Sequence, residues 1–347
     1  MARSDRFVAA LRGQPVDTTP VWIMRQAGRY LPEYRATRAK AGDFLTLCKT
    51  PELACEVTLQ PIDRLGVDAA ILFSDILIPL EPMGMKLGFP DEGPRLVPVR
   101  DEAGVRALRV PSAEAEMPFV MEAVRLIRRA LDGKVPLIGF AGAPFTMLTY
   151  AVEGQTGKQF AETKKLMYTA PAVAHLLLQK LTDTVADYLG AQIRAGAEVV
   201  QLFDSWVGQL APDDFRVFAA PYVKQLVDKL KPLGAPIIYF ANDGASLLAD
   251  AARLGADALG VDWRTPLDEA RARTGDGVTL QGNLDPCLLF GPIAEIERRA
   301  SDVVRRAGGK RHVFNLGHGI LPGTPPEHAI ALVEHVHRIG AAGHRIP

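Results

Sequence analysis

The chain has 347 residues, 48% of them hydrophobic, which is enough for a large core, and its 40 Lys and Arg side chains balance 40 Asp and Glu side chains. Because tracking a phosphate backbone requires a general positive field, this balance argues against nucleic-acid binding. The sequence has three cysteines without a C-x-x-C pair, no secretory signal and no apolar run of about 18 residues, so we expect a cytoplasmic protein without a structural zinc site or a membrane span.

Eight short runs rich in Val, Ile, Leu and Phe recur with helical stretches between them, as is typical of βα units around a parallel sheet. The predicted strands begin near Val21–Met24, Ala69–Phe73, Pro136–Phe140, Glu198–Phe203, Ile237–Phe240, Ala258–Val261, Val278–Gln281 and His312–Asn315. Eight units predict an α/β fold in which residues 1–347 form a single (β/α)8 TIM barrel. The active site of such a barrel lies at the C-terminal face of the strands.

Two helices have clear sequence signals. From Glu116 to Leu131 apolar residues recur at three- and four-residue steps, and Asp132–Gly133 provides a stop. The last helix is predicted to begin at Thr324–Glu327, where the threonine hydroxyl would be the N-cap and two prolines occupy the first turn. Between the second and third strands, Pro79–Pro98 is predicted to be a long loop insertion.

Two arginines follow the first predicted strand at a spacing of four residues. Arg25 and Arg29 lie beside Gly28, which has no side chain to crowd an incoming group. A guanidinium group is always charged and can grip a carboxylate through two parallel N–H bonds. The segment therefore predicts a small-molecule substrate that carries several negative charges.

Polar residues also follow the other predicted strands, where the βα loops of a barrel would share one rim. The whole set is Arg25 and Arg29, Ser74–Asp75, Thr146 and Tyr150, Asp204–Ser205, Asn242–Asp243, Asp262, Asn283 and Asp285, and His318. Asp, Asn and Ser are common caps and turn formers after a strand, and we assign Asp243 and Asp262 to that role. For His318 and Tyr150 a structural and a functional role remain open, and Gly317–Gly323 offers a weaker signal for a phosphate cradle.

Four segments, in order and spread over nearly the whole chain, resemble signatures of the uroporphyrinogen decarboxylase family. They are Met24–Arg35, Phe73–Leu77, Gly139–Thr146 with Thr149–Tyr150 and Glu153–Gly154, and Asn315–Gly319. The resemblance implies a (β/α)8 barrel that works without metal or organic cofactor, usually as a homodimer. It also implies a lyase of haem and porphyrin biosynthesis that removes the four acetate carboxylates of uroporphyrinogen III as CO2 and gives coproporphyrinogen III.

The same resemblance implies the residues that contact the substrate. They are Arg25, Gln26, Ala27, Gly28, Arg29, Asp75, Tyr150, Ser205 and His318. One position differs, because the residue after Ser205 is a histidine in some members and is Trp206 here. No role of an imidazole is therefore carried over to that position.

We expect Asp75, Arg25 and Arg29 to be catalytic. Protonating a pyrrole creates an electron sink for decarboxylation, and an ionised Asp75 that accepts the pyrrole N–H bonds would stabilise the resulting positive charge. The arginines would pair with the carboxylate arms, and Tyr150, Ser205 and His318 would add hydrogen bonds. A water, a substrate carboxylic acid and an arginine remain as alternative proton donors, because an aspartate of ordinary pKa is a poor acid near neutrality.

Two other functions are compatible with parts of this pattern. A zinc-dependent methyltransferase on a related barrel would need a thiolate-rich site, and Cys48, Cys55 and Cys287 form no cluster on the predicted rim. A non-catalytic tetrapyrrole-binding protein would use the arginines equally well. Such a carrier gains nothing from an acidic residue at the centre of its pocket, so Asp75 discriminates against it.

Overall fold

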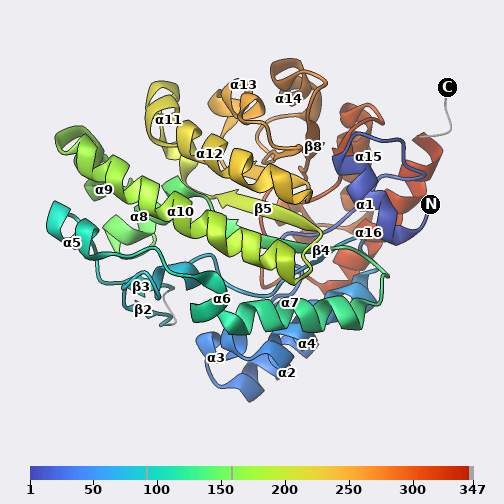
Figure 1. The fold of residues 1–347 in the computed structure, drawn as a ribbon. Helices are drawn as coiled ribbons and strands as arrows, with labels where there is room; N and C mark the ends of the chain where they lie inside the picture. The colour runs from blue at the N-terminus through green and yellow to red at the C-terminus, as the bar shows by residue number, and fades with distance from the viewer. Residues whose placement is uncertain (91–92, 158, 344–347) are drawn as a thin grey trace.

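Seven strands form a curled parallel sheet in the computed structural model, which describes residues 1–90, 93–157 and 159–343 (Figure 1). Their order in the sheet is their order in the chain, and neighbouring strands pair in register, for example Val200 with Ile237. They match seven of the eight predicted runs. The strands are β1 (Ala70–Ile71), β4 (Leu137–Gly142), β5 (Val199–Asp204), β6 (Ile237–Ala241), β7 (Ala258–Gly260), β8 (Thr279–Gln281) and β9 (His312–Val313).

The predicted first strand, Val21–Met24, forms a bridge rather than a strand. Val21 pairs in parallel with Phe314, and Phe314 N donates to Pro20 O at 2.8 Å. On the opposite side, Asp68 N donates to Val21 O at 2.7 Å. The segment therefore has backbone hydrogen bonds on both flanks, one toward the end of β9 and one toward the start of β1.

Side chains interrupt the regular pairing after Trp22. Ile23 N donates to Gln26 Oε1 at 3.1 Å, and Met24 N donates to Asn315 Oδ1 at 2.9 Å. Because these amide groups bond to side chains, the ladder cannot continue, and the expected four-residue strand is not formed. The interruption turns the chain into the loop that carries the two predicted arginines.

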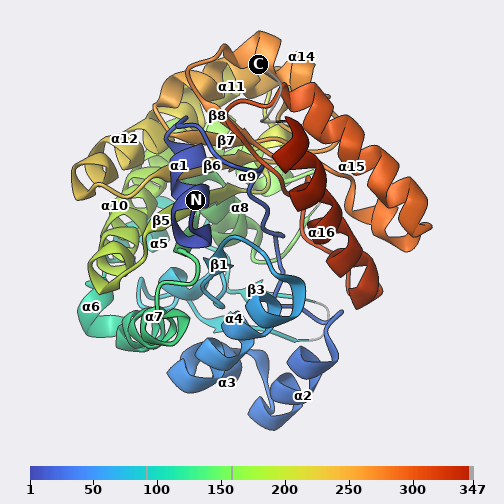
Figure 2. The same ribbon diagram turned by 90° about the vertical axis from the view of Figure 1, so that its right-hand side faces the viewer.

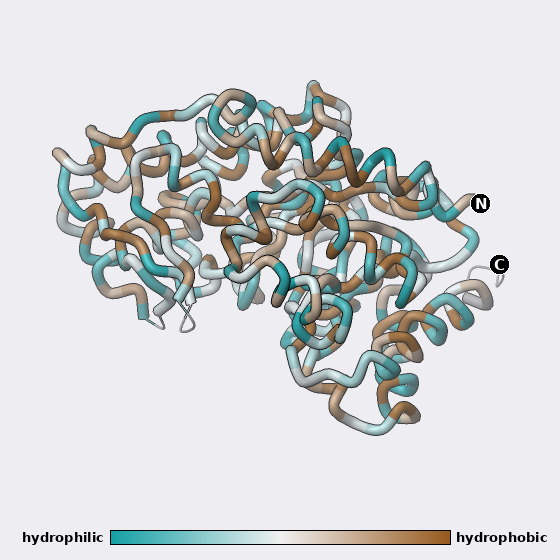
Figure 3. The backbone as a smooth tube through the Cα atoms, turned by 90° about the horizontal axis from the view of Figure 1, so that it is seen from below, coloured by the Kyte–Doolittle hydropathy of each residue, from teal (hydrophilic) through white to brown (hydrophobic). Residues whose placement is uncertain are grey.

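Helices cover the outer face of the sheet. α7 (Pro118–Leu131), α10 (Pro171–Ala195) and α12 (Ala220–Leu230) lie side by side along one flank (Figure 1), and Figure 2 shows α15 (Ile293–Ala307) beside α16 (Pro326–Gly343) on another. Along the helices of Figure 3, hydrophobic and hydrophilic stretches alternate, as expected when one face packs inward. Among the described helices, none has the length and apolarity that a membrane span requires.

The remaining helices are mostly short connections. The α-helices are α1 (Arg3–Leu11), α2 (Pro32–Ala41), α3 (Phe44–Lys49), α4 (Pro51–Leu65), α5 (Glu102–Ala107), α6 (Ala113–Glu116), α8 (Pro144–Glu153), α9 (Ala161–Thr169), α11 (Pro212–Phe218), α13 (Leu248–Ala251) and α14 (Leu267–Thr274). The 3-10 turns are η1 (Ile78–Leu80), η2 (Val207–Gln209), η3 (Lys231–Leu233), η4 (Ala245–Leu247), η5 (Ala252–Leu254) and η6 (Pro286–Phe290).

The predicted helix at 116–131 is confirmed, with a later start. Its predicted apolar face is buried, and Asp132 ends it in the left-handed conformation with φ 46°. Pro118 at the first helical position separates α7 from the short α6, because proline lacks the N–H that would continue α6.

Two local predictions need correction. The predicted loop Pro79–Pro98 contains η1 and an antiparallel pair of short strands, β2 (Leu87–Gly88) and β3 (Arg95–Leu96), while 91–92 lie outside the described residues. The predicted N-cap of the last helix is also wrong, because α16 begins at Pro326 and the buried Thr324 hydroxyl has no hydrogen-bond partner among the described residues. The two intervening prolines have no N–H to donate to it.

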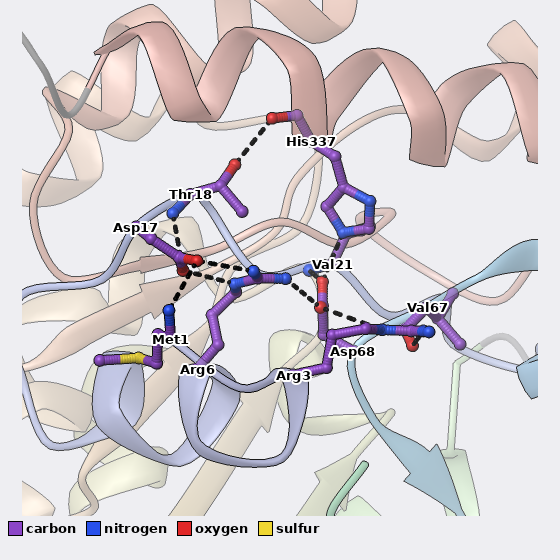
Figure 4. Close-up of polar contacts among 9 residues, drawn as sticks. All are labelled: Met1, Arg3, Arg6, Asp17, Thr18, Val21, Val67, Asp68 and His337. Carbon is purple, nitrogen blue, oxygen red and sulfur yellow. Dashed lines mark hydrogen bonds and ion pairs between the residues drawn. The ribbon is translucent and has the colours of Figure 1, made fainter. Parts of the chain in front are cut away.

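A buried carboxylate organises the N-terminal end of the sheet. Asp68 is fully buried just before β1, and its Oδ1 accepts a hydrogen bond from Arg6 Nη1 at 2.8 Å. Its Oδ2 accepts one from Val21 N at 2.8 Å and lies 2.6 Å from His337 Nε2. Asp68 thereby connects α1, the Val21 bridge and α16 (Figure 4).

Candidate active site

Four predicted site residues gather at the C-terminal end of the sheet. Asp75 lies beyond β1, Tyr150 in α8, His318 beyond β9, and Arg25 in the loop after the Val21 bridge. The charge of Arg25 shifts the pKa of each of the other three, which places them around one guanidinium group. We call these four residues the Asp75 cluster.

Asp75 is a half-buried carboxyl group with an unusual pKa. Its Oδ1 accepts a hydrogen bond from Leu77 N at 2.9 Å. Burial raises the pKa of Asp75 from 3.8 to about 6, although the Leu77 N–H and the Arg25 charge oppose the shift. The expected low pKa is therefore wrong, because the loss of hydration outweighs the nearby positive charge. At pH 7 the group is mainly ionised.

Arg25 is fixed by two close backbone approaches. It has a left-handed backbone with φ 64°, and its side chain crosses Gly319, where a Cβ would lie only 2.3 Å from Arg25 Cδ. A Cβ on Gly28 would lie 2.7 Å from the Arg25 carbonyl oxygen. Both glycines are therefore needed to shape the loop, and Gly28 accommodates the backbone of the loop itself.

The other loop residues point in different directions. The Gln26 side chain is fully buried, since its Oε1 accepts from Ile23 N and its Nε2 donates to Ala69 O at 3.0 Å. Ala27 is half-buried. Arg29 is exposed, and its charge lowers the pKa of Tyr34 on α2. The two predicted catalytic arginines thus diverge, Arg25 toward Asp75 and Arg29 toward α2.

Tyr150 and Ser205 provide hydroxyl groups. Burial, followed by the charge of Asp75, raises the pKa of Tyr150 to about 12, against the effects of the Trp206 N–H and Arg25. The phenol is therefore protonated near neutrality and can donate a hydrogen bond. The half-buried Ser205 follows β5 directly, and the ring of the adjacent Trp206 lies 6.1 Å from that of Tyr150.

His318 is a neutral hydrogen-bond donor. Its Nδ1 accepts a hydrogen bond from Gly319 N at 2.8 Å, so the proton of the neutral ring is assigned to Nε2. Burial, with the charges of Arg25 and Arg264, lowers the pKa of His318 to about 4. The imidazole therefore remains uncharged through the neutral range.

A layer of aromatic rings at the strand ends was not singled out from the sequence. Phe140 and Phe203 pack edge to face with centroids 5.5 Å apart, and Phe203 and Phe240 with centroids 6.1 Å apart. The Phe240 ring in turn lies 6.2 Å from His318. The only sequence signal was a phenylalanine near the end of each of β4, β5 and β6, which core packing explains equally well.

Asp204 and Thr146, two residues of the predicted rim, are buried in structural contacts. The fully buried Asp204 accepts hydrogen bonds from the hydroxyl groups of Thr146 and Tyr239, both at 2.7 Å. Burial raises the pKa of Asp204 to about 6, and these two hydrogen bonds oppose the shift. Asp204 holds α8 and β6 beneath Ser205.

The aspartates and asparagine after β7 and β8 shape turns, as assigned from the sequence for Asp262. Asp262 accepts hydrogen bonds from the backbone N–H groups of Asp243 and Arg264. Asn283 Nδ2 donates to Asp262 O at 2.8 Å, and Asp285 caps η6. Among the described residues, no group of three or more His, Cys, Asp and Glu side chains is arranged to hold a metal ion.

The comparisons with known proteins concern one family. The uroporphyrinogen decarboxylase (URO-D) family model matches residues 2–339. The chain is similar to the uroporphyrinogen decarboxylase of Hahella chejuensis, with 54% identity over 99% of this chain and 98% of the relative. It is equally similar to that of Myxococcus xanthus, with 54% identity over 98% of this chain and 97% of the relative.

Solved structures share the fold at low identity. A methyltransferase from Methanosarcina mazei has a TM-score of 0.83 and 22% identity, covering 98% of this chain and 99% of that chain. A putative vitamin-B12 independent methionine synthase from Listeria monocytogenes has a TM-score of 0.60 and 14% identity, covering 94% of this chain and 97% of that chain. At such identities the likeness concerns the fold alone.

Proposed function

Because the chain belongs to the uroporphyrinogen decarboxylase family and is therefore a carboxy-lyase, we propose that it removes the four acetate carboxylates of uroporphyrinogen III as CO2 and releases coproporphyrinogen III. The observation that carries the proposal is the half-buried carboxyl group of Asp75, whose pKa is raised to about 6 beside the cationic Arg25. Such a group can answer a positive charge that forms on the substrate during the reaction.

Asp75 would act on the pyrrole nitrogens. In its ionised form it accepts their N–H bonds and orients the macrocycle. When a proton adds to a pyrrole ring, positive charge spreads to the nitrogen, and the carboxylate then interacts more strongly with the transition state than with the ground state. The protonated ring accepts the electron pair that CO2 leaves behind. A second proton then completes the methyl group.

The surrounding side chains would hold the carboxylate arms. Arg25 offers a planar fork close to Asp75, and Arg29 offers another at the α2 side of the same loop. The Tyr150 phenol, the Ser205 hydroxyl and the Nε2–H of His318 add neutral donors. Gly28 and Ala27 form the substrate side of the loop, and Gln26 positions it through its buried backbone contacts.

The pKa of about 6 adds Asp75 to the alternative proton donors. At pH 7 roughly a tenth of such groups carry a proton, and general acids are most effective when their pKa lies near the working pH. A water or a substrate carboxylic acid remains an alternative. The chemistry proposed here uses no metal and no organic cofactor.

The proposal also includes the closed architecture. The backbone hydrogen bonds that Pro20 and Val21 make toward Phe314 and Asp68 support a barrel in which this segment fills the eighth position. Residues 1–347 would then form one (β/α)8 domain. A cytoplasmic homodimer completes the proposal, and the three unpaired cysteines fit a reducing compartment.

Anaerobic incubation with uroporphyrinogen III tests the function. The expected result is coproporphyrinogen III, with intermediates that have lost one, two or three carboxylates, and a rate that a metal chelator does not change. Binding without turnover would support the tetrapyrrole carrier. Turnover that requires zinc and transfers a methyl group would support the methyltransferase.

A further inference from the structure

A hollow of about 300 Å³ opens beside Ser205, and it contains an arginine that the proposed reaction does not use. Its polar lining comes from the loops after β5, β6 and β7 and comprises Ser205, Trp206, Gln209, Asn242, Asp243 and Arg264. Arg264 follows β7 by four residues, and 44% of its side chain is exposed. Its guanidinium group is the only cation among the described lining residues.

The Arg264 guanidinium is held in place without short hydrogen bonds. It stacks on Trp263 with its central carbon 4.2 Å from the ring centre. Its Nη1 lies 3.4 Å from Asp262 Oδ2 and its Nε 3.6 Å from Asp243 Oδ1, which exceeds the usual length of a charged hydrogen bond. Stacking and attraction therefore fix the fork, while its N–H groups stay available for a ligand.

The two aspartates do not cancel this site. The Asp262 carboxylate already accepts backbone N–H bonds from Asp243 at 2.5 Å and from Arg264 at 2.9 Å, which disperse its charge. The side chain of Asp243 is 44% exposed, so water screens its repulsion of an incoming anion. A ligand carboxylate at hydrogen-bonding distance would interact with the fork more closely than either aspartate does.

The hollow is continuous with the proposed substrate site. Ser205 belongs to both, and the charge of Arg264 contributes to the lowered pKa of His318. Arg264 thus lies between two of the side chains proposed to hold carboxylate arms. Trp206, which lines the hollow, also packs against Tyr150 of the Asp75 cluster.

We propose that this hollow is a subsite for one carboxylate arm of the tetrapyrrole, with Arg264 as the residue that selects for the carboxylate; the inference rests on the proposed function. The arm is an acetate or a propionate, and both carry the group that the fork recognises. The Ser205 hydroxyl supplies a further donor within the same hollow. A neutral arm would leave the guanidinium without a matching partner.

Fluorescence titration with uroporphyrin and coproporphyrin tests the subsite. For Arg264→Ala we expect about tenfold weaker binding, as for one charge-assisted contact. Arg264→Lys keeps a positive charge beside the two aspartates but loses the fork, so we expect most of the same loss. Arg273→Ala is the matched control, because Arg273 is 46% exposed, lies 3.6 Å from Glu269 and does not line the hollow.

The two porphyrins separate the sources of the carboxylate. Coproporphyrin keeps the propionates and lacks the acetates, so a loss for both ligands identifies a propionate and a loss for uroporphyrin alone identifies an acetate. Unchanged affinity of both Arg264 variants for both porphyrins would overturn the subsite. In turnover of uroporphyrinogen III, KM should rise about tenfold in Arg264→Ala with kcat within about twofold. A wild-type protein without decarboxylase activity would refute the proposed function instead.

Discussion

The two ends of strand β1 each carry an aspartate, and the two carboxylates have opposite surroundings. Asp68, before the strand, is fully buried among hydrogen bonds from Arg6 and Val21 N and a contact with His337 (Figure 4). Asp75, beyond the strand, receives one hydrogen bond within the described structure, from Leu77 N. The same side chain therefore stabilises the fold where donors surround it and stays available for a ligand where they are missing.

This difference has an energetic meaning. A carboxylate that is removed from water without enough hydrogen bonds destabilises the folded state in its ionised form, and the pKa of about 6 at Asp75 expresses that cost. Functional sites commonly retain such a cost because the ligand later supplies the missing partners. The comparison of Asp68 with Asp75 can be tested by replacing each carboxylate with an amide.

The largest effect is expected at Asp68. Asp68→Asn removes the charge that Arg6 and His337 face in a buried setting, so we expect the free energy of unfolding to fall by about 3 kcal/mol in urea denaturation. Asp17→Asn serves as the control, because Asp17 also binds Arg6 but its side chain is 39% exposed, and we expect a loss below about 1 kcal/mol. Equal losses in the two variants would remove the special role of Asp68.

The opposite sign is expected for the stability of Asp75→Asn. The pKa of Asp75 is raised from 3.8 to about 6 in the folded protein, so wild-type stability falls as pH rises through this interval. The amide cannot ionise and still accepts the Leu77 N–H. Asp75→Asn should therefore be more stable by about 1 to 2 kcal/mol at pH 7.5, allowing for partial exposure.

The pH dependence provides the check on this stabilisation. The difference between Asp75→Asn and wild type should shrink toward pH 4.5, where the wild-type carboxyl is protonated in the folded protein. Asp204, whose pKa is also raised to about 6, is present in both proteins, so only their difference reports on Asp75. A variant that is less stable than wild type at pH 7.5 would contradict the assignment.

A smaller effect is expected at Arg29. Arg29→Lys keeps the positive charge but loses the bidentate fork, so we expect kcat/KM for uroporphyrinogen III to fall about tenfold, or about 1.4 kcal/mol. Arg125→Lys on the outer face of α7 should change nothing, since Arg125 is 54% exposed and pairs with Glu122. Normal kinetics in Arg29→Lys would restrict the carboxylate clamp to Arg25.

The strands could be predicted because short apolar runs between helices have few other uses, and seven of the eight runs are strands within the described residues. The first run could not be predicted as a bridge, since the interruption comes from Gln26 and from Asn315, which is distant in sequence. Likewise, Thr324 looked like an N-cap until α16 began two residues later. Side-chain hydrogen bonds made these differences, and hydrophobic periodicity does not report them.

The site shows the same limit. The positions of Asp75, Tyr150 and His318 after successive strands were sufficient to bring them together, because strand ends share one edge of the sheet. The raised pKa of Asp75 depends on burial, which only the tertiary structure supplies. Arg264 carried no motif, and its only signal was its position just after Asp262 at the end of a predicted strand.

The turnover number of Asp75→Asn with uroporphyrinogen III under anaerobic conditions at pH 7 tests the central claim most directly. We expect kcat to fall by about 100-fold while the melting temperature stays at or above that of wild type, because the amide cannot answer the positive charge on the pyrrole. A loss of less than about tenfold, or 1.4 kcal/mol, in the folded variant would contradict the role of Asp75.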